Sequence, residues 1–299
     1  MLLPQPLIHG ILIKRYKRFL ADIRLDNGEI VTAHSPNTGS MKGCNIPGSP
    51  VILSRSDNPK RKLPYTWELV KVGNAWVCVN TTYPNRIVKE AIEAGGIAEL
   101  RDYRQLHTEV PYSGNSRIDI LLKYSAQNCY VEVKNVTLAE AGTARFPDAV
   151  TTRGQKHLQD LMAMVASGQR GVIFFVINRA DTDRFAPADD IDPRYGELLR
   201  EAARAGVEIL AYQTRITPPE IVLSHALPGG RVSPFVGLRS PRRDRRARSR
   251  SANPVETPPP TAFQPPRSSF RGRLQDARLP LRRSEPQPSR STFPVEHDR

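Results

Sequence analysis

Short apolar runs separated by turn signals fill the first 80 residues. The segment "HGILIKRYKRFLADIRL" predicts a pair of strands, "DNG" at 26–28 predicts a turn, and "EIVTAHS", "VILSRS" and "AWVCVNT" predict further strands. Because no helical periodicity interrupts them, the pattern predicts a small β-barrel over residues 1–82. A sheet subdomain of another kind is the alternative that strand counting leaves open.

Helical and extended segments alternate over residues 83–230. Residues 85–95 show one apolar helical face and end at Gly95-Gly96, and three strands follow. A helix capped by Thr151 or Thr152, a continuous apolar strand at 171–178, and a last helix and strand complete the series. This order predicts an α/β domain built on a mixed, largely buried sheet.

Charge is distributed unevenly along the chain. The net charge of +14 divides into +4 for residues 1–230 and +10 for residues 231–299, which hold 16 Arg, 12 Pro and no Lys. No hydrophobic periodicity survives in this last segment, so its composition predicts a disordered tail. Its charge would strengthen nucleic-acid binding without specificity, although a solvated tail with no specific role is the simpler interpretation.

Three charged residues interrupt an apolar hairpin in "RIDILLKYSAQNCYVEVKN" (117–135). Because side chains alternate faces along a strand, Glu132 and Lys134 share one face. If the hairpin turns about Ser125-Ala126, Asp119 lies opposite Glu132, with about 5 Å between Cβ atoms. Opposed carboxylates repel each other unless a cation separates them. Either Lys134 neutralises them in a structural cluster, or they hold a divalent metal beside a phosphate.

The element order, with D…ExK on the second and third strands, resembles the PD-(D/E)xK nuclease superfamily. Residues 1–230 are also similar to the sugar fermentation stimulation protein A family, on the runs "SPNTGSM" (35–41), "YVEVKNVTL" (130–138), "RFPDAVTTRGQKHLQDL" (145–161) and "DIDPRYGELLREAARAGVEILAY" (190–212). The resemblance implies an OB-like barrel before a nuclease-like domain, DNA binding, and a link to regulation of maltose metabolism. The proline that the superfamily places before its first aspartate is absent, since Ile118 stands there.

The same resemblance implies a set of site residues. Asp119 and Glu132 would bind Mg²⁺ or Mn²⁺, the Val133 carbonyl would be a further ligand, and Lys134 would position the attacking water. The implied activity is metal-dependent phosphodiester hydrolysis. The alternative is a non-catalytic DNA-binding regulator whose acid–lysine cluster is structural or vestigial.

In the superfamily, the first helix often adds a glutamate to the site. Here Glu90 lies at the edge of the apolar stripe and Glu93 points away from it, so Glu90 is the predicted residue, with a solvated helix charge as the alternative. On the second helix, Gln155 lies closer to the apolar stripe than Lys156 and His157. Gln155 is therefore the predicted site residue of that helix.

Basic and aromatic residues are interleaved in two barrel segments. They are Lys14, Arg15, Lys17 and Arg18 around Tyr16, and Lys60, Arg61 and Lys62 before Tyr65 and Trp67. Such a combination is typical of a nucleic-acid groove, where cations meet phosphates and rings stack on bases. A solvated face with two core aromatics explains it equally well.

The three cysteines are far apart and form no CxxC pair, which favours a reducing compartment. No apolar run of about 18 residues occurs, so the sequence predicts no membrane span, and its N-terminus lacks the features of a signal peptide. The expectation is a cytoplasmic protein whose partner is DNA. Its oligomeric state stays open.

Overall fold

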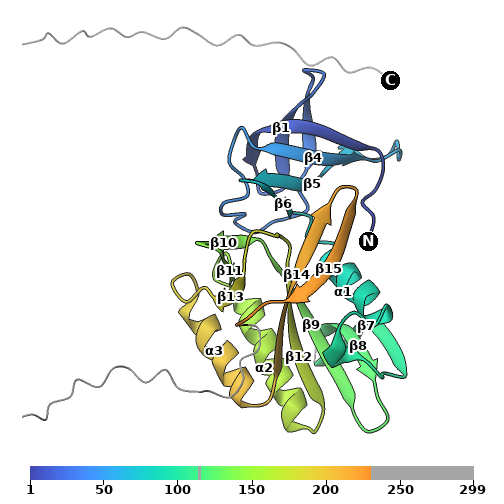
Figure 1. Cartoon of the computed structure of the whole chain (residues 1–299), viewed down its shortest axis with the longest axis vertical. Coiled ribbons are helices and arrows are strands. Elements are labelled where there is room, and N and C mark those ends of the chain that lie inside the picture. The colour runs from blue at the N-terminus through green and yellow to red at the C-terminus, as the bar shows by residue number, and fades with distance from the viewer. Residues whose placement is uncertain (114–115, 230–299) are drawn as a thin grey trace, which may run out of the picture. The chain divides into compact units, whose positions relative to one another are not determined.

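Five strands of the N-terminal region close into a barrel in the computed structural model, which describes residues 1–113 and 116–229 (Figure 1). They are β1 (Leu7–Tyr16), β2 (Leu20–Leu25), β3 (Ile30–His34), β4 (Pro50–Arg55) and β5 (Tyr65–Val72). Parallel pairing of His34 with Thr66 joins β3 to β5, and β6 (Ala75–Cys78) pairs with β5. The barrel is as predicted, but β5 was not anticipated. The tail prediction falls outside the described residues.

A six-stranded mixed sheet forms the centre of the second domain. Its order is β15-β14-β12-β9-β8-β7. The bounds are β7 (Gln105–Ser113), β8 (Ser116–Lys123), β9 (Asn128–Val136), β12 (Arg170–Ile177), β14 (Glu208–Thr217) and β15 (Glu220–Ala226). Strands β9, β12 and β14 are parallel, while their outer neighbours are antiparallel. The predicted mixed, buried sheet is confirmed.

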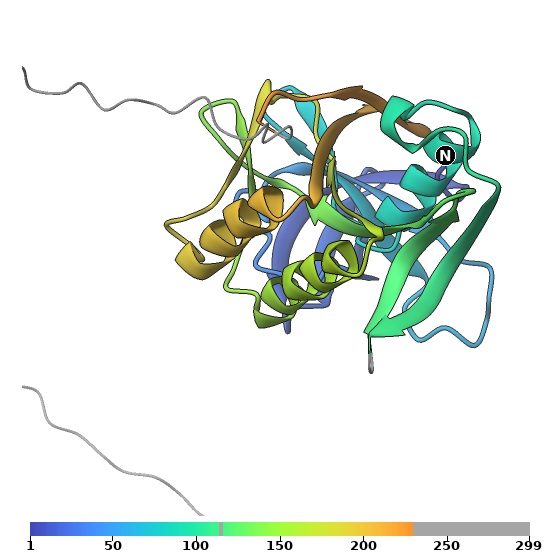
Figure 2. The same cartoon turned by 90° about the horizontal axis from the view of Figure 1, so that it is seen from below.

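Helices cover both faces of this sheet (Figure 2). Helix α1 (Pro84–Glu93) packs on one face, and α2 (Thr152–Ala166) and α3 (Pro193–Arg204) pack on the other. The 3-10 turn η1 (Ala98–Leu100) occupies part of a segment that was predicted as a strand. A small sheet of β10 (Leu138–Glu140), β11 (Thr143–Phe146) and β13 (Arg184–Pro187) lies outside the central one.

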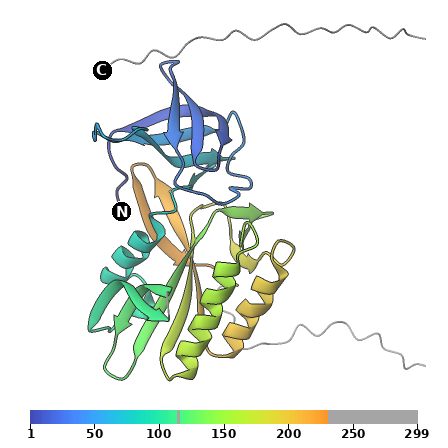
Figure 3. The same cartoon turned by 180° about the vertical axis from the view of Figure 1, so that it is seen from behind.

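The barrel and the second domain share one hydrophobic cluster. Leu3, Ile52 and Leu69 of the barrel region join the buried residues of α1 and β9 in it. At the N-terminus, Leu2 pairs with Glu220 of β15, and Figure 3 shows the β14–β15 hairpin reaching toward the barrel. The barrel is therefore fixed against the sheet by apolar burial as well as by backbone hydrogen bonds. None of the described helices is both long and apolar enough to cross a membrane.

Helix α2 begins at a side-chain cap. The Thr151 hydroxyl accepts a hydrogen bond of 3.1 Å from the Gly154 N–H, which has no partner within the helix. Because this cap sets where α2 begins, it also positions the residues of the first helical turn against β9.

Replacing Thr151 with Ala should remove this cap and lower the free energy of unfolding by about 1 kcal/mol. Urea unfolding measures the change, and Thr152→Ala, at the exposed first position of the same helix, is the control. Equal effects of the two substitutions would show that the cap does not stabilise α2.

Candidate active site

The hairpin of β8 and β9 has the register that the sequence predicts. Ile120 pairs with Val131, and Lys123 pairs with Asn128. Extended by one position, this register places Asp119 opposite Glu132, but the regular pairing ends at Ile120 and Val131. Instead, the Val133 N–H donates a hydrogen bond of 2.7 Å to Asp119 Oδ2. A carboxylate thus takes the place of a backbone acceptor at the point where the two acids meet.

One further donor holds the Asp119 side chain, while its surroundings disfavour the ionised form of its carboxyl group. Asn85 Nδ2, at the start of α1, donates to Asp119 Oδ1 at 2.8 Å. Burial first, and the Glu132 charge second, raise the pKa of Asp119 to about 6, although these hydrogen bonds and Lys134 oppose the rise. Asn85 Nδ2 also lies 3.4 Å from Oε1 of Glu109, whose φ of 55° is left-handed inside β7. Such strain is common beside functional sites.

Glu132 is nearly inaccessible, with 3% of its side chain exposed. Its Oε1 accepts a 2.7 Å hydrogen bond from Lys134 Nζ and a short one from His157 Nδ1. Burial raises the pKa of Glu132, but the His157 hydrogen bond and the Lys134 charge outweigh it and lower the pKa below its usual range. The other oxygen, Oε2, is buried and has no hydrogen-bond partner among the described residues.

His157 joins this cluster, which the sequence analysis did not predict. Arg153 Nε donates to His157 Nε2 at 3.2 Å, so the ring proton is on Nδ1 and is donated to Glu132. His157 Nδ1 and Lys134 Nζ lie 3.0 Å apart because both donate to one oxygen. The buried face of α2 consists of Gly154, His157, Leu158 and Leu161. The predicted apolar stripe consists of Leu158, Leu161, Met162 and Val165. Of these, Met162 and Val165 are only half-buried, so the observed buried face is shifted toward His157.

Two predicted site residues are engaged elsewhere. Glu90 forms ion pairs of 2.9 Å with the amino group of Met1 and 2.7 Å with Arg86. Gln155 donates through Nε2 to both carboxylate oxygens of Asp192, the N-cap residue of α3. The structure therefore does not support either prediction. Asn85 on α1 and His157 on α2 are the helix residues that contact the acids.

The cluster fits a divalent cation. Glu132 Oε2 is buried and has no hydrogen-bond partner among the described residues. The Glu132 charge makes ionisation of Asp119 less favourable. Mg²⁺ and Mn²⁺ prefer carboxylate oxygens of this kind as ligands. Nowhere in residues 1–113 and 116–229 do three His, Cys, Asp or Glu side chains gather in a metal-binding arrangement. A metal here would rely on the two carboxylates, with a backbone carbonyl such as that of Val133.

The first basic segment of the barrel is partly structural. Arg15 Nη2 donates to the carbonyls of Asn37 at 2.9 Å and Gly39 at 3.0 Å, and Arg18 Nε donates to Thr38 at 3.1 Å. Both arginines thus shape the loop at 35–41. Lys14 forms a 3.5 Å ion pair with Asp22, whereas Lys17 is exposed in the β1–β2 turn.

The aromatic residues differ in their availability for stacking. Trp67 is fully buried in the barrel core, so it cannot stack on a base. Phe19, beside Lys17 in the β1–β2 turn, is 47% exposed and was not singled out from the sequence. Lys60, Arg61 and Lys62 are exposed in the β4–β5 loop. In OB barrels, the β1–β2 and β4–β5 loops are the ones that bind oligonucleotides.

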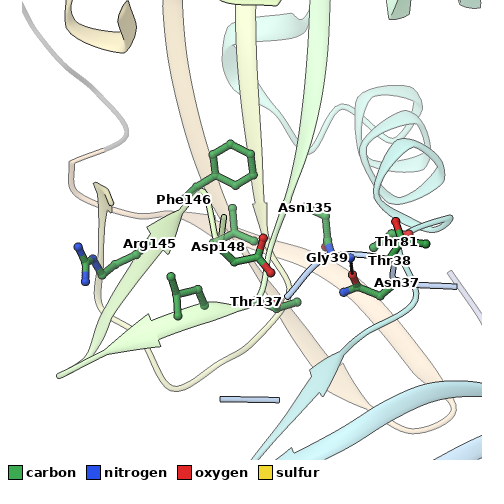
Figure 4. A pocket seen from close by; sticks show the side chains of 11 residues that line it. Asn37, Thr38, Gly39, Thr81, Asn135, Thr137, Arg145, Phe146 and Asp148 are labelled. Atoms are coloured by element: carbon green, nitrogen blue, oxygen red, sulfur yellow. Dashed lines mark hydrogen bonds between the residues drawn. The ribbon is translucent and has the colours of Figure 1, made fainter. Parts of the chain in front are cut away.

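A cavity of about 210 Å³ lies where the loop at 35–41 meets the end of β9. In Figure 4, Asn37, Gly39 and Thr81 line one side of it, and Arg145 and Asp148 line the other. The loop's hydroxyl and amide groups are used internally, because the Ser40 hydroxyl and the Met41 N–H both donate to Asp148. This loop therefore joins the barrel to the second domain.

These features define a class: a closed OB-type barrel followed by a nuclease-like mixed-sheet domain with a buried acid–lysine cluster. Family models confirm it. One described as "SfsA N-terminal OB domain" matches residues 13–79, and one described as "Sugar fermentation stimulation protein RE domain" matches residues 82–220. The chain belongs to the sugar fermentation stimulation protein family.

Relatives and a solved structure agree with this assignment. A "Sugar fermentation stimulation protein homolog" of Geobacter sulfurreducens is 61% identical over 76% of this chain and 98% of its own length. One of Acidithiobacillus ferrooxidans is 55% identical over 75% of this chain and 97% of its own. The structure of Pyrococcus furiosus SfsA in complex with Ca²⁺ matches with a TM-score of 0.70 and 29% identity, over 76% of this chain and 97% of that one.

The raised pKa of Asp119 predicts a pH dependence of stability in a chelator. The folded pKa of about 6 exceeds the unfolded value of about 3.9, so the folded state binds more protons between them. Asp119 therefore makes its full contribution to the free energy of unfolding below about pH 4, and this contribution is lost as pH rises through 6. Asp119→Asn should stabilise the protein by roughly 2 kcal/mol more at pH 7 than at pH 4, measured by urea unfolding. A difference independent of pH would contradict a raised pKa of Asp119 in the folded state.

Proposed function

We propose that the second domain is a metal-dependent nuclease and that the barrel holds its nucleic-acid substrate. The observation that carries the proposal is the buried, unpartnered Oε2 of Glu132 opposite Asp119, beside the Lys134 ammonium. A structural ion cluster needs no free oxygen, whereas a metal site does. The record of Ca²⁺ with the archaeal relative supports a divalent-cation site in this family.

Each residue of the cluster has a distinct role in this proposal. Asp119 and Glu132 would hold Mg²⁺ or Mn²⁺ together with the Val133 carbonyl. When bound, the metal would polarise a phosphoryl oxygen and lower the pKa of a water molecule. Lys134 would orient the attacking water and offset the charge that develops on the phosphate. The Lys134 side chain is 12% exposed, compared with 3% for Glu132.

The residues around the acids keep this arrangement in place. The hydrogen bond from His157 Nδ1 fixes Glu132 Oε1, which directs the opposite oxygen toward the proposed cation. Asn85 and the Val133 N–H fix both oxygens of Asp119. Arg153 is exposed at the start of α2 beside His157, where it can contact a phosphate.

Cleavage of labelled single- and double-stranded DNA and RNA tests the activity, with Mg²⁺, Mn²⁺ or a chelator. We expect metal-dependent cleavage of at least one substrate, and a loss on the order of 10²-fold for Lys134→Ala. Lys89→Ala, an exposed lysine of α1, is the control and should retain activity. If no substrate is cleaved with either metal, the alternative of a non-catalytic DNA-binding regulator is favoured.

Binding by the β4–β5 loop is tested through its salt dependence. Replacing Lys60, Arg61 and Lys62 together with Ala should weaken DNA binding and reduce the slope of log affinity against log salt by about 0.9 for each lost phosphate contact. Fluorescence anisotropy in a chelator measures affinity without cleavage, and Arg194→Ala on α3 is a single-charge control. An unchanged slope would place the DNA-binding surface outside this loop.

A further inference from the structure

A second polar pocket, of about 400 Å³, lies at the end of the barrel where β3 and β5 join. The β4–β5 loop and the segment leading into α1 complete its wall. Its polar lining includes Ser54, Glu68 and Asn80 inside, and His34, Arg55 and Arg61 around them. None of these residues belongs to the acid–lysine cluster described above.

The inner wall of this pocket carries a buried carboxylate. Glu68 is 1% exposed, Ser54 Oγ donates to its Oε1 at 2.6 Å, and Asn80 Nδ2 donates to its Oε2 at 2.7 Å. Both donors are neutral and are themselves buried. The Tyr83 hydroxyl is a third hydrogen-bond partner of Glu68. Because a carboxylate has about four acceptor positions, one position stays open for a donor of a ligand.

Cationic groups surround this carboxylate. Arg55 and Arg61 are exposed, and Arg61 Nη2 is fixed by a 3.1 Å hydrogen bond to the Thr66 hydroxyl. Burial first, and the Arg61 charge second, lower the pKa of His34, so this ring stays neutral beside the arginine. The pocket therefore offers hydrogen-bond acceptors inside and guanidinium donors at its opening.

We propose that this pocket binds one nucleotide of the substrate strand, with its phosphate on Arg55 and Arg61 and its base on Glu68. Guanidinium groups bind phosphate through paired hydrogen bonds. Guanine is the expected base, because its adjacent N1–H and N2–H₂ groups can donate to the open position of Glu68 and take the place of the Tyr83 hydroxyl on it. The inference rests on the proposed function, since it gives the strand a second point of attachment.

The pocket is close to the proposed active site along the chain. Tyr83 lines the pocket, and Asn85, two residues later, donates to Asp119. Two residues span at most about 7 Å. A nucleotide bound here would therefore lie a short distance along the strand from the phosphate to be cleaved, and would select which bond reaches the acids.

Calorimetric titration of the full chain with GMP, AMP, CMP and UMP in a chelator tests this pocket. We expect GMP to bind most tightly, and Arg61→Ala to weaken its binding at least tenfold. Arg24→Ala on β2 is the matched control, since it removes the same charge from an exposed barrel position that does not line the pocket. It should change GMP affinity less than threefold. Glu68→Gln should abolish the preference for GMP while retaining phosphate-dependent binding.

Two results would overturn the inference: binding of no nucleotide at millimolar concentration, or equal losses for Arg61→Ala and Arg24→Ala. Because a chelator is present, absence of cleavage does not affect the result, and the pocket and the nuclease activity can fail separately. Should Glu68→Gln not fold, the two arginine variants still decide the outcome. Guanine-containing dinucleotides are a second set of probes. They should bind at least as tightly as GMP if the pocket binds a nucleotide within a strand. Weaker binding would show that the pocket binds free nucleotides instead.

Discussion

The repulsion between a buried carboxylate, Glu132, and a half-buried one, Asp119, is the constraint on which this site depends. Asp119 and Glu132 come opposite each other in a sheet that helices cover on both faces, where a charge loses most of its hydration. Lys134 and His157 satisfy one oxygen of Glu132, and Asn85 and the Val133 N–H satisfy Asp119. One buried oxygen stays without a donor. A divalent cation would relieve both the repulsion and this missing contact.

The surrounding fold brings residues from distant segments to this point. The start of α1 supplies Asn85, and the first turns of α2, positioned by the Thr151 cap, supply His157. The hydrophobic cluster shared by the barrel and the sheet fixes the barrel's basic loops relative to the acids. A substrate held by those loops would thus meet a fixed site, which lowers the entropic cost of positioning it.

Local patterns predicted the hairpin and most elements well. The register of Asp119 and Glu132 followed from a short turn and strict alternation, because a hairpin's loop fixes its pairing. The strand β5 was missed because buried Glu68 interrupts its apolar pattern. The partners of that carboxylate, Ser54, Asn80 and Tyr83, come from other segments of the chain. The parallel order of β9, β12 and β14 also joins segments far apart in sequence, which no local pattern encodes.

The helix residues of the site could not be predicted from a helical wheel alone. The buried face of α2 depends on its contacts with β9 and α3, and these bring His157 toward the acids and direct Gln155 to Asp192. Glu90 pairs with the chain's own amino group, a partner whose position only the fold determines. In both cases a rotation of a helix by a fraction of a turn decides which polar residue reaches the site.

Thermal melting with and without Mn²⁺ distinguishes a metal site from an ion cluster, because a ligand that binds only the folded state stabilises it by mass action. We expect Mn²⁺ to raise the melting temperature of the wild type by several degrees, to raise that of Asp119→Asn much less, and still to raise that of Lys134→Ala. A wild type that Mn²⁺ leaves unchanged, together with a severe loss of stability in Lys134→Ala, would show that the acids and the lysine form a structural ion cluster instead.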